Sequence, residues 1–336
     1  MDSLQLVTSN IVVNIILFII GLYVLIKGSD WFVSAASRIA KKHNISEIVI
    51  GLTIVSIGTS LPELATNIYA SIVNQGSISL GNVVGSNIAN ICLVLALGGI
   101  ITGGIKVSRS ILRSDIVILV LTFIFLLFLT VFTDKFSFGA LSGYLGRIDG
   151  VILLVIFSCY MLFVMKNSSS LKKKEKVDTI NADSNYSEFK DYMLLIVGMI
   201  IIFIGAKLLV DNIVWCAVRF HVPKSVIAAS VIAFGTSVPE LAVTITGAVK
   251  GKNDLALGNV IGSCFFNITG VLGISVCIRP IIASSSMIYI MMPTMILASL
   301  LLLIFPGKQG FINRKKSVIL LIIYAVFIAY SLKSMI

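Results

Sequence analysis

The sequence predicts an all-α membrane protein of ten transmembrane helices, built from two inverted repeats of five helices each. The first observation behind this prediction is composition. Of the 336 residues, 57% are hydrophobic and only 12% are charged, and the mean hydropathy is +1.05. A soluble domain of this length could not bury so much apolar surface. The second observation is a series of apolar runs near the bilayer-spanning length of about 20 residues. The third is a polar motif pair that occurs twice.

Ten apolar runs predict the transmembrane segments. The second, third, seventh and eighth runs are interrupted by Gly, Ser, Thr, Asn, Pro and Glu, and are therefore expected to be broken helices. The other six are rich in Ile, Leu, Val and Phe, as lipid-facing helices are. The first run is long and lacks a basic start, which predicts a retained span and not a cleaved signal peptide. The runs are residues 10–33, 46–73, 78–103, 114–133, 148–165, 192–216, 224–249, 254–278, 282–305 and 317–334.

Basic residues are unevenly divided between alternate loops. One set of loops carries 18 of the 26 Lys and Arg residues and the other set carries 6, with Lys27 and Lys207 near span ends. Cytoplasmic loops are the ones enriched in Lys and Arg, so both termini are expected outside the cytoplasm. This distribution also explains the net charge of +11 without a nucleic-acid partner.

A repeated polar motif divides the chain into two halves. GTSLPELA at 58–65 recurs as GTSVPELA at 235–242, and LGNVVGSNIAN at 80–90 recurs as LGNVIGSCFFN at 257–267. Both blocks recur at one fixed offset, because 235 − 58 equals 257 − 80. Each half holds five spans, so the second copy crosses the membrane in the opposite direction, as in many secondary transporters. The predicted units are a first repeat at 1–165, a cytoplasmic linker at 166–190 and a second repeat at 191–336.

Two glutamates within the repeated motifs are the candidate ion-binding residues. Glu63 and Glu240 are the acidic residues placed deep inside the spans, where a charge costs at least ~2.5 kcal/mol and usually marks an ion path. A glutamate that caps a half-helix, or pairs with a lysine, is the structural alternative. Equivalent positions in both repeats and the lack of a mid-span cation nearby favour ion binding. Pro62 and Pro239 precede them, and proline removes a backbone donor and so frees a carbonyl.

Neutral oxygen donors surround these glutamates in the sequence. For such residues the alternative to cation binding is helix packing or interhelical hydrogen bonding. Asn82 and Asn259 are assigned to that alternative. Convergent His or Cys residues are absent, and all-oxygen ligation suits hard cations such as calcium. Two glutamates neutralise one divalent ion, and sodium accepts the same ligands, so competition between the two ions is a physical basis for exchange. The candidate donors are the side chains of Thr59, Ser60, Ser86, Asn90, Thr236, Ser237, Ser263 and Asn267.

On the motifs GTSLPE…GNVVGSNIAN and GTSVPE…GNVIGSCFFN and the ten-span layout, the chain resembles the sodium/calcium exchanger family of cation antiporters, as a compact prokaryotic-type member. The resemblance implies that Glu63 and Glu240 bind a central calcium ion. It also implies sliding of the first and sixth spans as the gating motion. It implies sodium sites formed by Thr59, Ser60, Thr236, Ser237, Ser86 and Ser263, backbone carbonyls contributed by Ser56 and Ala233, and Asn90 and Asn267 at the middle of the cluster.

Three positions depart from the family pattern. Residue 267 is Asn where several members carry Asp, which removes one titratable group and leaves proton sensitivity and ion stoichiometry open. Residue 56 is Ser where Ala is familiar, which matters less because the carbonyl is the expected donor. Cys264 and Phe266 are interpreted as packing variation.

The expected function is antiport of Ca²⁺ against Na⁺ by alternating access, with both ions as transported ligands and with no cofactor. Exchange of Ca²⁺ for H⁺, or a K⁺-dependent exchange, is the nearest alternative, because two neighbouring carboxylates also accept protons. A cation channel is a further alternative. An intramembrane enzyme is not expected, because the spans hold neither a nucleophile–base pair nor two facing aspartates. Oligomeric state is left open.

Overall fold

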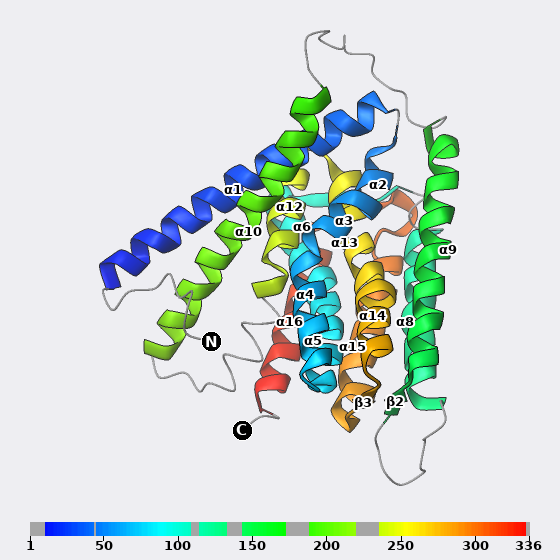
Figure 1. Cartoon of the computed structure of the whole chain (residues 1–336). Coiled ribbons are helices and arrows are strands. Elements are labelled where there is room, and N and C mark those ends of the chain that lie inside the picture. The colour runs from blue at the N-terminus through cyan, green and yellow to red at the C-terminus, as the bar shows by residue number, and fades with distance from the viewer. Residues whose placement is uncertain are drawn as a thin grey trace.

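The computed structural model describes residues 11–43, 45–108, 114–132, 143–172, 188–219 and 235–333. Over these ranges the protein is a helical bundle with four short strands, and α1 and α10 lie side by side along one flank (Figure 1). Seven described helices are long and apolar enough to cross a membrane, and a bent helix pair makes an eighth candidate. The all-helical membrane architecture predicted from the sequence is confirmed at this level.

In the first half, the elements follow the predicted runs in order, and η marks a short π-helical or 3₁₀ turn. They are α1 (Ile11–Lys42), α2 (Glu47–Ile50), η1 (Gly51–Val55), α3 (Ser56–Thr59), α4 (Leu61–Ile72), α5 (Gly76–Ala89), η2 (Asn90–Val94), α6 (Leu95–Thr102), β1 (Gly104–Lys106), α8 (Asp115–Phe132), β2 (Gly143–Leu145) and α9 (Arg147–Lys172).

In the second half, the seventh predicted run is described only from residue 235. The elements are α10 (Glu188–Arg219), α12 (Val238–Val249), α13 (Asn253–Phe266), η3 (Asn267–Val271), α14 (Leu272–Ile278), β3 (Ile281–Ala283), η4 (Met287–Met291), α15 (Met292–Ile304), η5 (Gly307–Gln309), β4 (Phe311–Asn313) and α16 (Arg314–Lys333). Within the predicted linker at 166–190, α9 continues to Lys172 and α10 begins at Glu188.

Of the four runs predicted to be broken helices, the second and seventh contain a break, whereas the third and eighth contain a π turn instead. The second run bends by 47° between Thr59 and Leu61, and α12 of the seventh run begins after Ser237, whose backbone matches that of Ser60 at the first break. For the third and eighth runs the prediction of broken helices is wrong. Their helices are continuous and instead contain the π turns η2 and η3. A π turn accommodates the local irregularity without freeing the backbone, and such turns are frequent at functional sites.

Helices α1 and α10 pack through glycines. A Cβ atom placed on Gly28 would lie 2.9 Å from the backbone nitrogen of Ile202, and one placed on Gly205 would lie 2.6 Å from that of Leu25. Gly21 similarly faces Gly205, and Gly28 faces Gly198. Residue numbers rise along one helix as they fall along the other, so the two helices run antiparallel. Gly21 and Gly198 are separated by the repeat offset, as are Gly28 and Gly205, so the contact follows the internal repeat.

Two strand pairs join the halves to each other. Strand β1 pairs with β4, with Gly104 opposite Asn313, and β2 pairs with β3, with Gly143 opposite Ala283. Strand β1 follows α6 of the first half, and its partner β4 precedes α16, the last helix of the second half. Strand β3 follows α14 of the second half, and its partner β2 precedes α9, the last helix of the first half. The main hydrophobic core likewise draws on both halves, with Phe123 and Phe265 fully buried in it. The two repeats are thus packed as one body.

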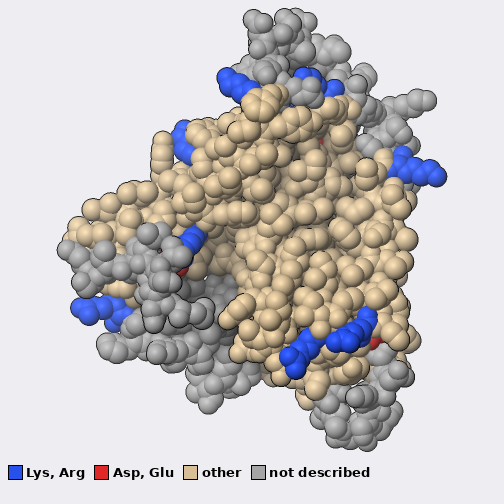
Figure 2. Space-filling model, viewed as in Figure 1, with Lys and Arg blue, Asp and Glu red and all other residues tan. Residues whose placement is uncertain are grey.

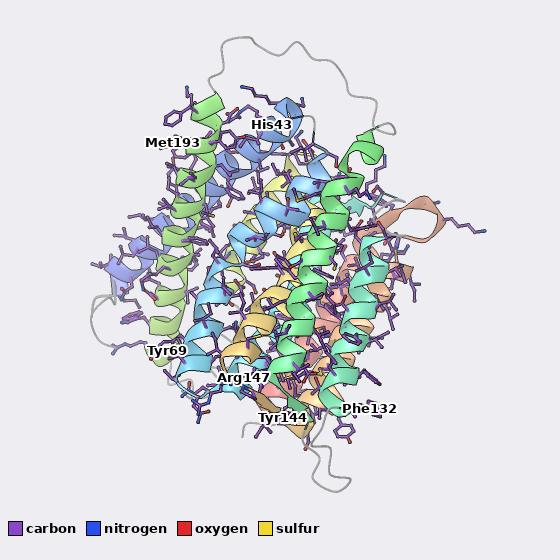
Figure 3. The ribbon with its side chains drawn as sticks, turned by 45° about the vertical axis from the view of Figure 1, so that its right-hand side comes forward. His43, Tyr69, Phe132, Tyr144, Arg147 and Met193 are labelled. Atoms are coloured by element: carbon purple, nitrogen blue, oxygen red, sulfur yellow. The ribbon has the colours of Figure 1, made fainter. Side chains whose placement is uncertain are left out.

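The outer surface matches a bilayer environment. Large apolar side chains are exposed along α1 and α9, including Ile19 at 58% and Leu162 at 67% exposed. On the right-hand part of Figure 2, Lys and Arg side chains lie toward the two ends and the surface between them carries none. Figure 3 places His43 and Met193 at one end of the bundle and Tyr69 and Arg147 at the other. An exposed apolar belt of this extent is stable against lipid and not against water.

Two equivalent glycines are predicted to differ in their tolerance of a methyl group. At Gly258 a Cβ atom would lie 2.8 Å from the carbonyl oxygen of Ile48 and 3.1 Å from Cα of Gly51, whereas at Gly81 the nearest atom is the methyl carbon of Met287, at 3.8 Å. Gly258→Ala should therefore destabilise the purified protein by ~1–3 kcal/mol through overpacking. Gly81→Ala should be neutral or stabilising, and thermal denaturation in detergent compares the two. Equal melting temperatures for the two variants would contradict the close packing of α13 against α2 and η1.

Candidate cation-binding site

Each repeat presents its glutamate at the beginning of a helix. Ser60 (φ −89°, ψ 13°) and Ser237 (φ −88°, ψ 3°) interrupt the helical backbone, and α4 and α12 start at the following residues. Pro62 stands in the first turn of α4, where the missing N–H would have no intrahelical partner in any case. Glu63 lies in that same turn, and Glu240 occupies the equivalent place on α12. The positive end of a helix dipole therefore faces each carboxyl group.

The two carboxyl groups meet in the interior of the protein. Glu63 and Glu240 are both fully buried, and they are close enough to interact electrostatically. The hydroxyl group of Ser60, from the first half, donates a 2.7 Å hydrogen bond to Oε1 of Glu240, from the second. On the other side of the pseudo-symmetric arrangement, Thr236 and Ser237 lie next to the Glu63 carboxyl group. The structure thus brings the two predicted carboxylates into one cluster, with hydroxyl groups from both halves.

A hydrogen-bond network connects the first helix break to α13. Thr59 Oγ1 donates to Oδ1 of Asn259 at 3.1 Å and lies 3.5 Å from the hydroxyl oxygen of Ser263. The carbonyl oxygen of Ser56 accepts hydrogen bonds from the hydroxyl group of Ser263 at 3.3 Å and from the backbone N–H of Ser60 at 3.1 Å. It also lies 3.3 Å from the hydroxyl oxygen of Thr59, which can donate its one proton here or to Asn259. The Ser56 carbonyl group, which is expected to be a cation ligand, therefore already accepts hydrogen bonds from protein groups in this conformation. Ala233, the matching carbonyl, lies outside the described residues.

Two buried asparagines connect the glutamate-bearing helices to their neighbours. Asn259 Nδ2 donates to Oγ1 of Thr244 at 3.0 Å and to the carbonyl oxygen of Glu240 at 3.4 Å. Asn67, on the same helix as Glu63, donates from Nδ2 to the Glu63 carbonyl oxygen at 2.6 Å and accepts a 2.8 Å hydrogen bond from Ser79 of α5. The interhelical hydrogen bonding predicted for Asn259 is observed, whereas that predicted for Asn82 is not, because both of its amide atoms lack a partner. The role of Asn67 was not predicted. Its position, one repeat offset before Thr244, was the available signal.

Eight buried polar side-chain atoms of the candidate residues lack a hydrogen-bond partner. Leaving a buried polar atom unpaired costs roughly 1–3 kcal/mol, and a bound cation would pair with the oxygens among them. In the part of the chain that the structure describes, no three or more His, Cys, Asp or Glu side chains are grouped to hold a metal. The candidate donors are two carboxylates and neutral oxygens, which hard cations prefer. The eight unpaired atoms are both carboxyl oxygens of Glu63, Oε2 of Glu240, the hydroxyl oxygens of Ser86 and Ser237, both amide atoms of Asn90 and Oδ1 of Asn267.

A cavity of about 280 Å³ leads from α10 toward both helix breaks. Val210 of α10 faces Gly235, where an added Cβ atom would lie 3.1 Å from it. Lys207 and Asp211 form an ion pair of 2.8 Å in the cavity wall. The lining thus reaches both prolines that precede the glutamates. The lining residues are Pro62, Phe203, Ala206, Lys207, Val210, Asp211, Gly235, Thr236 and Pro239.

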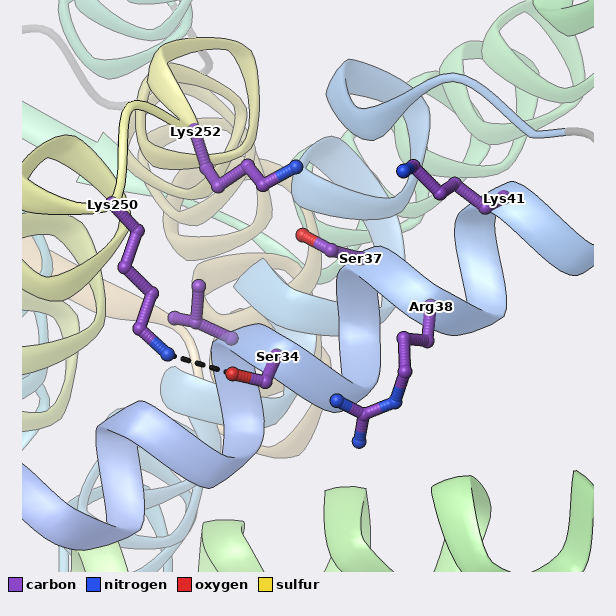
Figure 4. Close-up of a pocket in the computed structure, with 7 residues that line it drawn as sticks. Ser34, Ser37, Arg38, Lys41, Lys250 and Lys252 are labelled. Atoms are coloured by element: carbon purple, nitrogen blue, oxygen red, sulfur yellow. Dashed lines mark hydrogen bonds between the residues drawn. The ribbon is translucent and has the colours of Figure 1, made fainter. Parts of the chain in front are cut away.

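A second cavity, of about 230 Å³, lies at the end of α1 and is lined by cationic side chains (Figure 4). Lys250 reaches from the turn between α12 and α13 to the hydroxyl oxygen of Ser34, at 2.6 Å, and to Asp30, at 2.5 Å. Lys252 pairs with Glu47 at 2.6 Å. The positive charge of these side chains would repel a cation. We therefore do not include this cavity in the candidate cation site.

The fold and the site together define an integral membrane transporter with a buried cluster of oxygen donors suited to a small, hard cation. The family model described as sodium/calcium exchanger protein matches residues 13–166 and 190–333. The two matched segments leave out most of the predicted linker and cover both repeats. The chain therefore belongs to the sodium/calcium exchanger family.

Individual relatives extend over nearly the whole chain. The sodium/calcium exchanger MaX1 of Methanosarcina acetivorans is 36% identical over 95% of this chain and 98% of its own length. An uncharacterized membrane protein of Methanocaldococcus jannaschii is 37% identical over 93% of this chain and 96% of its own. A solved structure of the sodium-calcium exchanger NCX_Mj, soaked with zero Na⁺ and Ca²⁺, superposes with a TM-score of 0.80 at 34% identity, covering 96% of this chain and 99% of that one.

The cavity beside α10 predicts different chemical reactivity for two positions on that helix. Val210 lines the cavity, whereas Ile204 is 50% exposed on the apolar outer surface. In membranes, Val210→Cys should react faster with a charged, membrane-impermeant methanethiosulfonate than Ile204→Cys, because thiol reactivity requires water and the thiolate form. The parent chain, labelled in parallel, gives the background from its five native cysteines. Equal labelling of the two variants would mean that water does not enter the cavity.

Proposed function

We propose that the protein exchanges Ca²⁺ for Na⁺ across the membrane by alternating access. One observation carries this proposal: Glu63 and Glu240, one from each repeat, are fully buried together, and three of their four carboxyl oxygens have no hydrogen-bond partner. Two buried negative charges are strongly unfavourable unless they are compensated. A single divalent cation, or a set of monovalent cations, supplies that compensation. Family membership supports the same reading.

The proposed ligand set combines the unpartnered oxygens with oxygens that are hydrogen-bonded within the protein in this conformation. Glu63 and Glu240 bind the Ca²⁺ ion, since carboxylates supply the charge that a divalent ion needs. The hydroxyl groups of Thr59, Ser60, Ser86, Thr236, Ser237 and Ser263 flank the carboxylates and form Na⁺ sites with them. The amide oxygens of Asn90 and Asn267 complete the cluster, and the carbonyl groups of Ser56 and Ala233 join it in the Na⁺-loaded form.

Competition for this shared cluster produces the exchange. Na⁺ is close to Ca²⁺ in size and accepts the same oxygen ligands, so the cluster holds one Ca²⁺ or several Na⁺ ions but not both sets. Loading with either neutralises the carboxylates. The unloaded cluster keeps its charge, and a conformational change that shields it further from water is costly. Movement of the gate helices α1 and α10 is thereby coupled to cation occupancy of the cluster. A bound ligand shifts a conformational equilibrium only if it stabilises one of the two states more than the other.

The alternating states are proposed to arise from an inverted repeat of five spans in each half, with α1 and α10 as the moving pair. The antiparallel glycine contacts between α1 and α10 at the repeat offset support this arrangement. The reciprocal pairing of β1 with β4 and of β2 with β3 supports it as well. Units 1–165 and 191–336 are the proposed repeats. The membrane is proposed to be the plasma membrane of a prokaryote, with both chain termini on its outer side.

Removing either carboxylate charge should abolish calcium exchange. In proteoliposomes, Glu63→Gln and Glu240→Gln should each lower Na⁺-driven Ca²⁺ uptake by roughly 100-fold or more, since a lost partner of a buried charge costs ~3–5 kcal/mol. Glu47→Gln is the matched control, because Glu47 pairs with Lys252 in the cationic end of the bundle and should leave uptake near the parent level. Substantial uptake by either site variant would remove its glutamate from the binding site.

The counter-ion can be identified by imposing gradients one at a time. With an outward Na⁺ gradient and no pH gradient, proteoliposomes should accumulate Ca²⁺. A pH gradient alone, or a K⁺ gradient alone, should drive less than a tenth of that uptake. The hydroxyl and amide oxygens of the cluster, including that of Asn267, can bind Na⁺ but take up no proton. Uptake driven as strongly by the pH gradient would replace the Na⁺ assignment with a proton exchange, and a requirement for K⁺ would show K⁺ dependence.

A further inference from the structure

The two copies of the second motif differ in polarity at one internal position. Asn87 in LGNVVGSNIAN corresponds to Cys264 in LGNVIGSCFFN, one repeat offset further along the chain. Both side chains are fully buried, and the two residues contact each other across the pseudo-symmetric arrangement. The first repeat therefore has a buried amide group at the position where the second repeat has a thiol, next to the proposed cation cluster.

Hydrogen bonds from Asn87 fix the orientation of a neighbouring amide. Nδ2 of Asn87 lies 3.3 Å from the backbone carbonyl oxygen of Cys264. A carbonyl oxygen can only accept, so the amide nitrogen of Asn87 must face it and the amide oxygen must face the other way. That oxygen, Oδ1 of Asn87, accepts a 3.2 Å hydrogen bond from Nδ2 of Asn267. The nitrogen of Asn267 is thereby held, and its oxygen is left without a partner.

The equivalent amide in the first repeat lacks this arrangement. Asn90 corresponds to Asn267, and the residue corresponding to its orienting neighbour is Cys264, whose thiol lies beside Asn90 but offers no amide. Neither amide atom of Asn90 has a hydrogen-bond partner of normal geometry, and both are buried. The two asparagines at the cluster therefore differ: one is oriented by a neighbouring amide and the other is not.

We infer that Asn87 is a positioning residue that turns the amide oxygen of Asn267 toward the bound cation. This inference rests on the proposed cation site. An asparagine at a cation site can present either its oxygen, which attracts the ion, or its NH₂ group, which repels it. Asn87 removes the second option by accepting a hydrogen bond from that NH₂ group. Neutral donors matter more to Na⁺ than to Ca²⁺, because the two carboxylates supply most of the attraction for the divalent ion.

The test is a double-mutant cycle read by cation-dependent thermal stabilisation of the purified protein. A ligand that binds only the folded state stabilises it by RT ln(1 + [L]/Kd). The NaCl concentration that produces a fixed rise in the melting temperature, called here the NaCl midpoint, therefore changes in proportion to the Na⁺ dissociation constant, and the CaCl₂ midpoint is defined in the same way. Asn87→Ala should raise the NaCl midpoint by about 10-fold, as loss of one oriented donor implies. The CaCl₂ midpoint should move less. In an Asn267→Asp background, Asn87→Ala should change the NaCl midpoint by less than about 2-fold, because either oxygen of a carboxylate can face the ion.

A matched control separates positioning from packing. Thr269 is a fully buried polar residue on η3 whose hydroxyl group bonds to its own helix, at the carbonyl oxygen of Phe265. Thr269→Val should lower the melting temperature without shifting either midpoint. An unchanged NaCl midpoint for Asn87→Ala, or an equal shift in the Asn267→Asp background, would overturn the positioning role. The proposed exchange would still stand in that case, because it is tested separately by the Glu63 and Glu240 variants.

Discussion

Placing two carboxyl groups beyond the reach of water sets the conditions that the rest of this protein has to meet. Glu63 and Glu240 are fully buried, and neither takes part in an ion pair among the residues that the structure describes. Compensation for their charge can come from helix ends, hydroxyl groups, bound protons or a bound cation. The helix breaks at Ser60 and Ser237 aim the positive ends of α4 and α12 at the carboxyl groups, and the Ser60 hydroxyl group bonds to Glu240. The proposed cation site supplies the part of the compensation that these protein groups leave open.

Much of this site was predictable because its signals are local in the sequence. Glutamate after proline in an apolar run, repeated at one offset, is costly at membrane depth and so identifies the carboxylates without a structure. The π turns at Asn90 and Asn267 were not predictable, because glycine and serine weaken a helix without determining whether it breaks or adds a residue to one turn. The hydrogen bond that Asn67 accepts from Ser79 of α5 also escaped prediction, because it depends on which helix faces turn toward each other.

The two repeats differ in the hydrogen bonds around their glutamates. An ideal two-fold arrangement would give both glutamates the same neighbours, yet Ser60 bonds to Glu240 while Ser237 is unpartnered. The carbonyl oxygen of Glu63 accepts from Asn67, whereas that of Glu240 accepts from Asn259. An alternating cycle needs inequivalent halves at any one moment, since the two faces of the membrane are not open together. The asymmetric hydrogen bonds are consistent with one such state.

The way in which α1 and α10 pack sets this pair of helices apart from the rest of the bundle. These helices contribute to a smaller hydrophobic cluster, with Phe32 and Ile202, separate from the main core. Glycine contacts hold them to each other at close range, so the two helices are packed as a unit. The cavity beside Val210 lies between α10 and the helix breaks. The movement proposed for this pair would therefore change access to the carboxylates and leave the hydrogen bond that joins α12 to α13 in place.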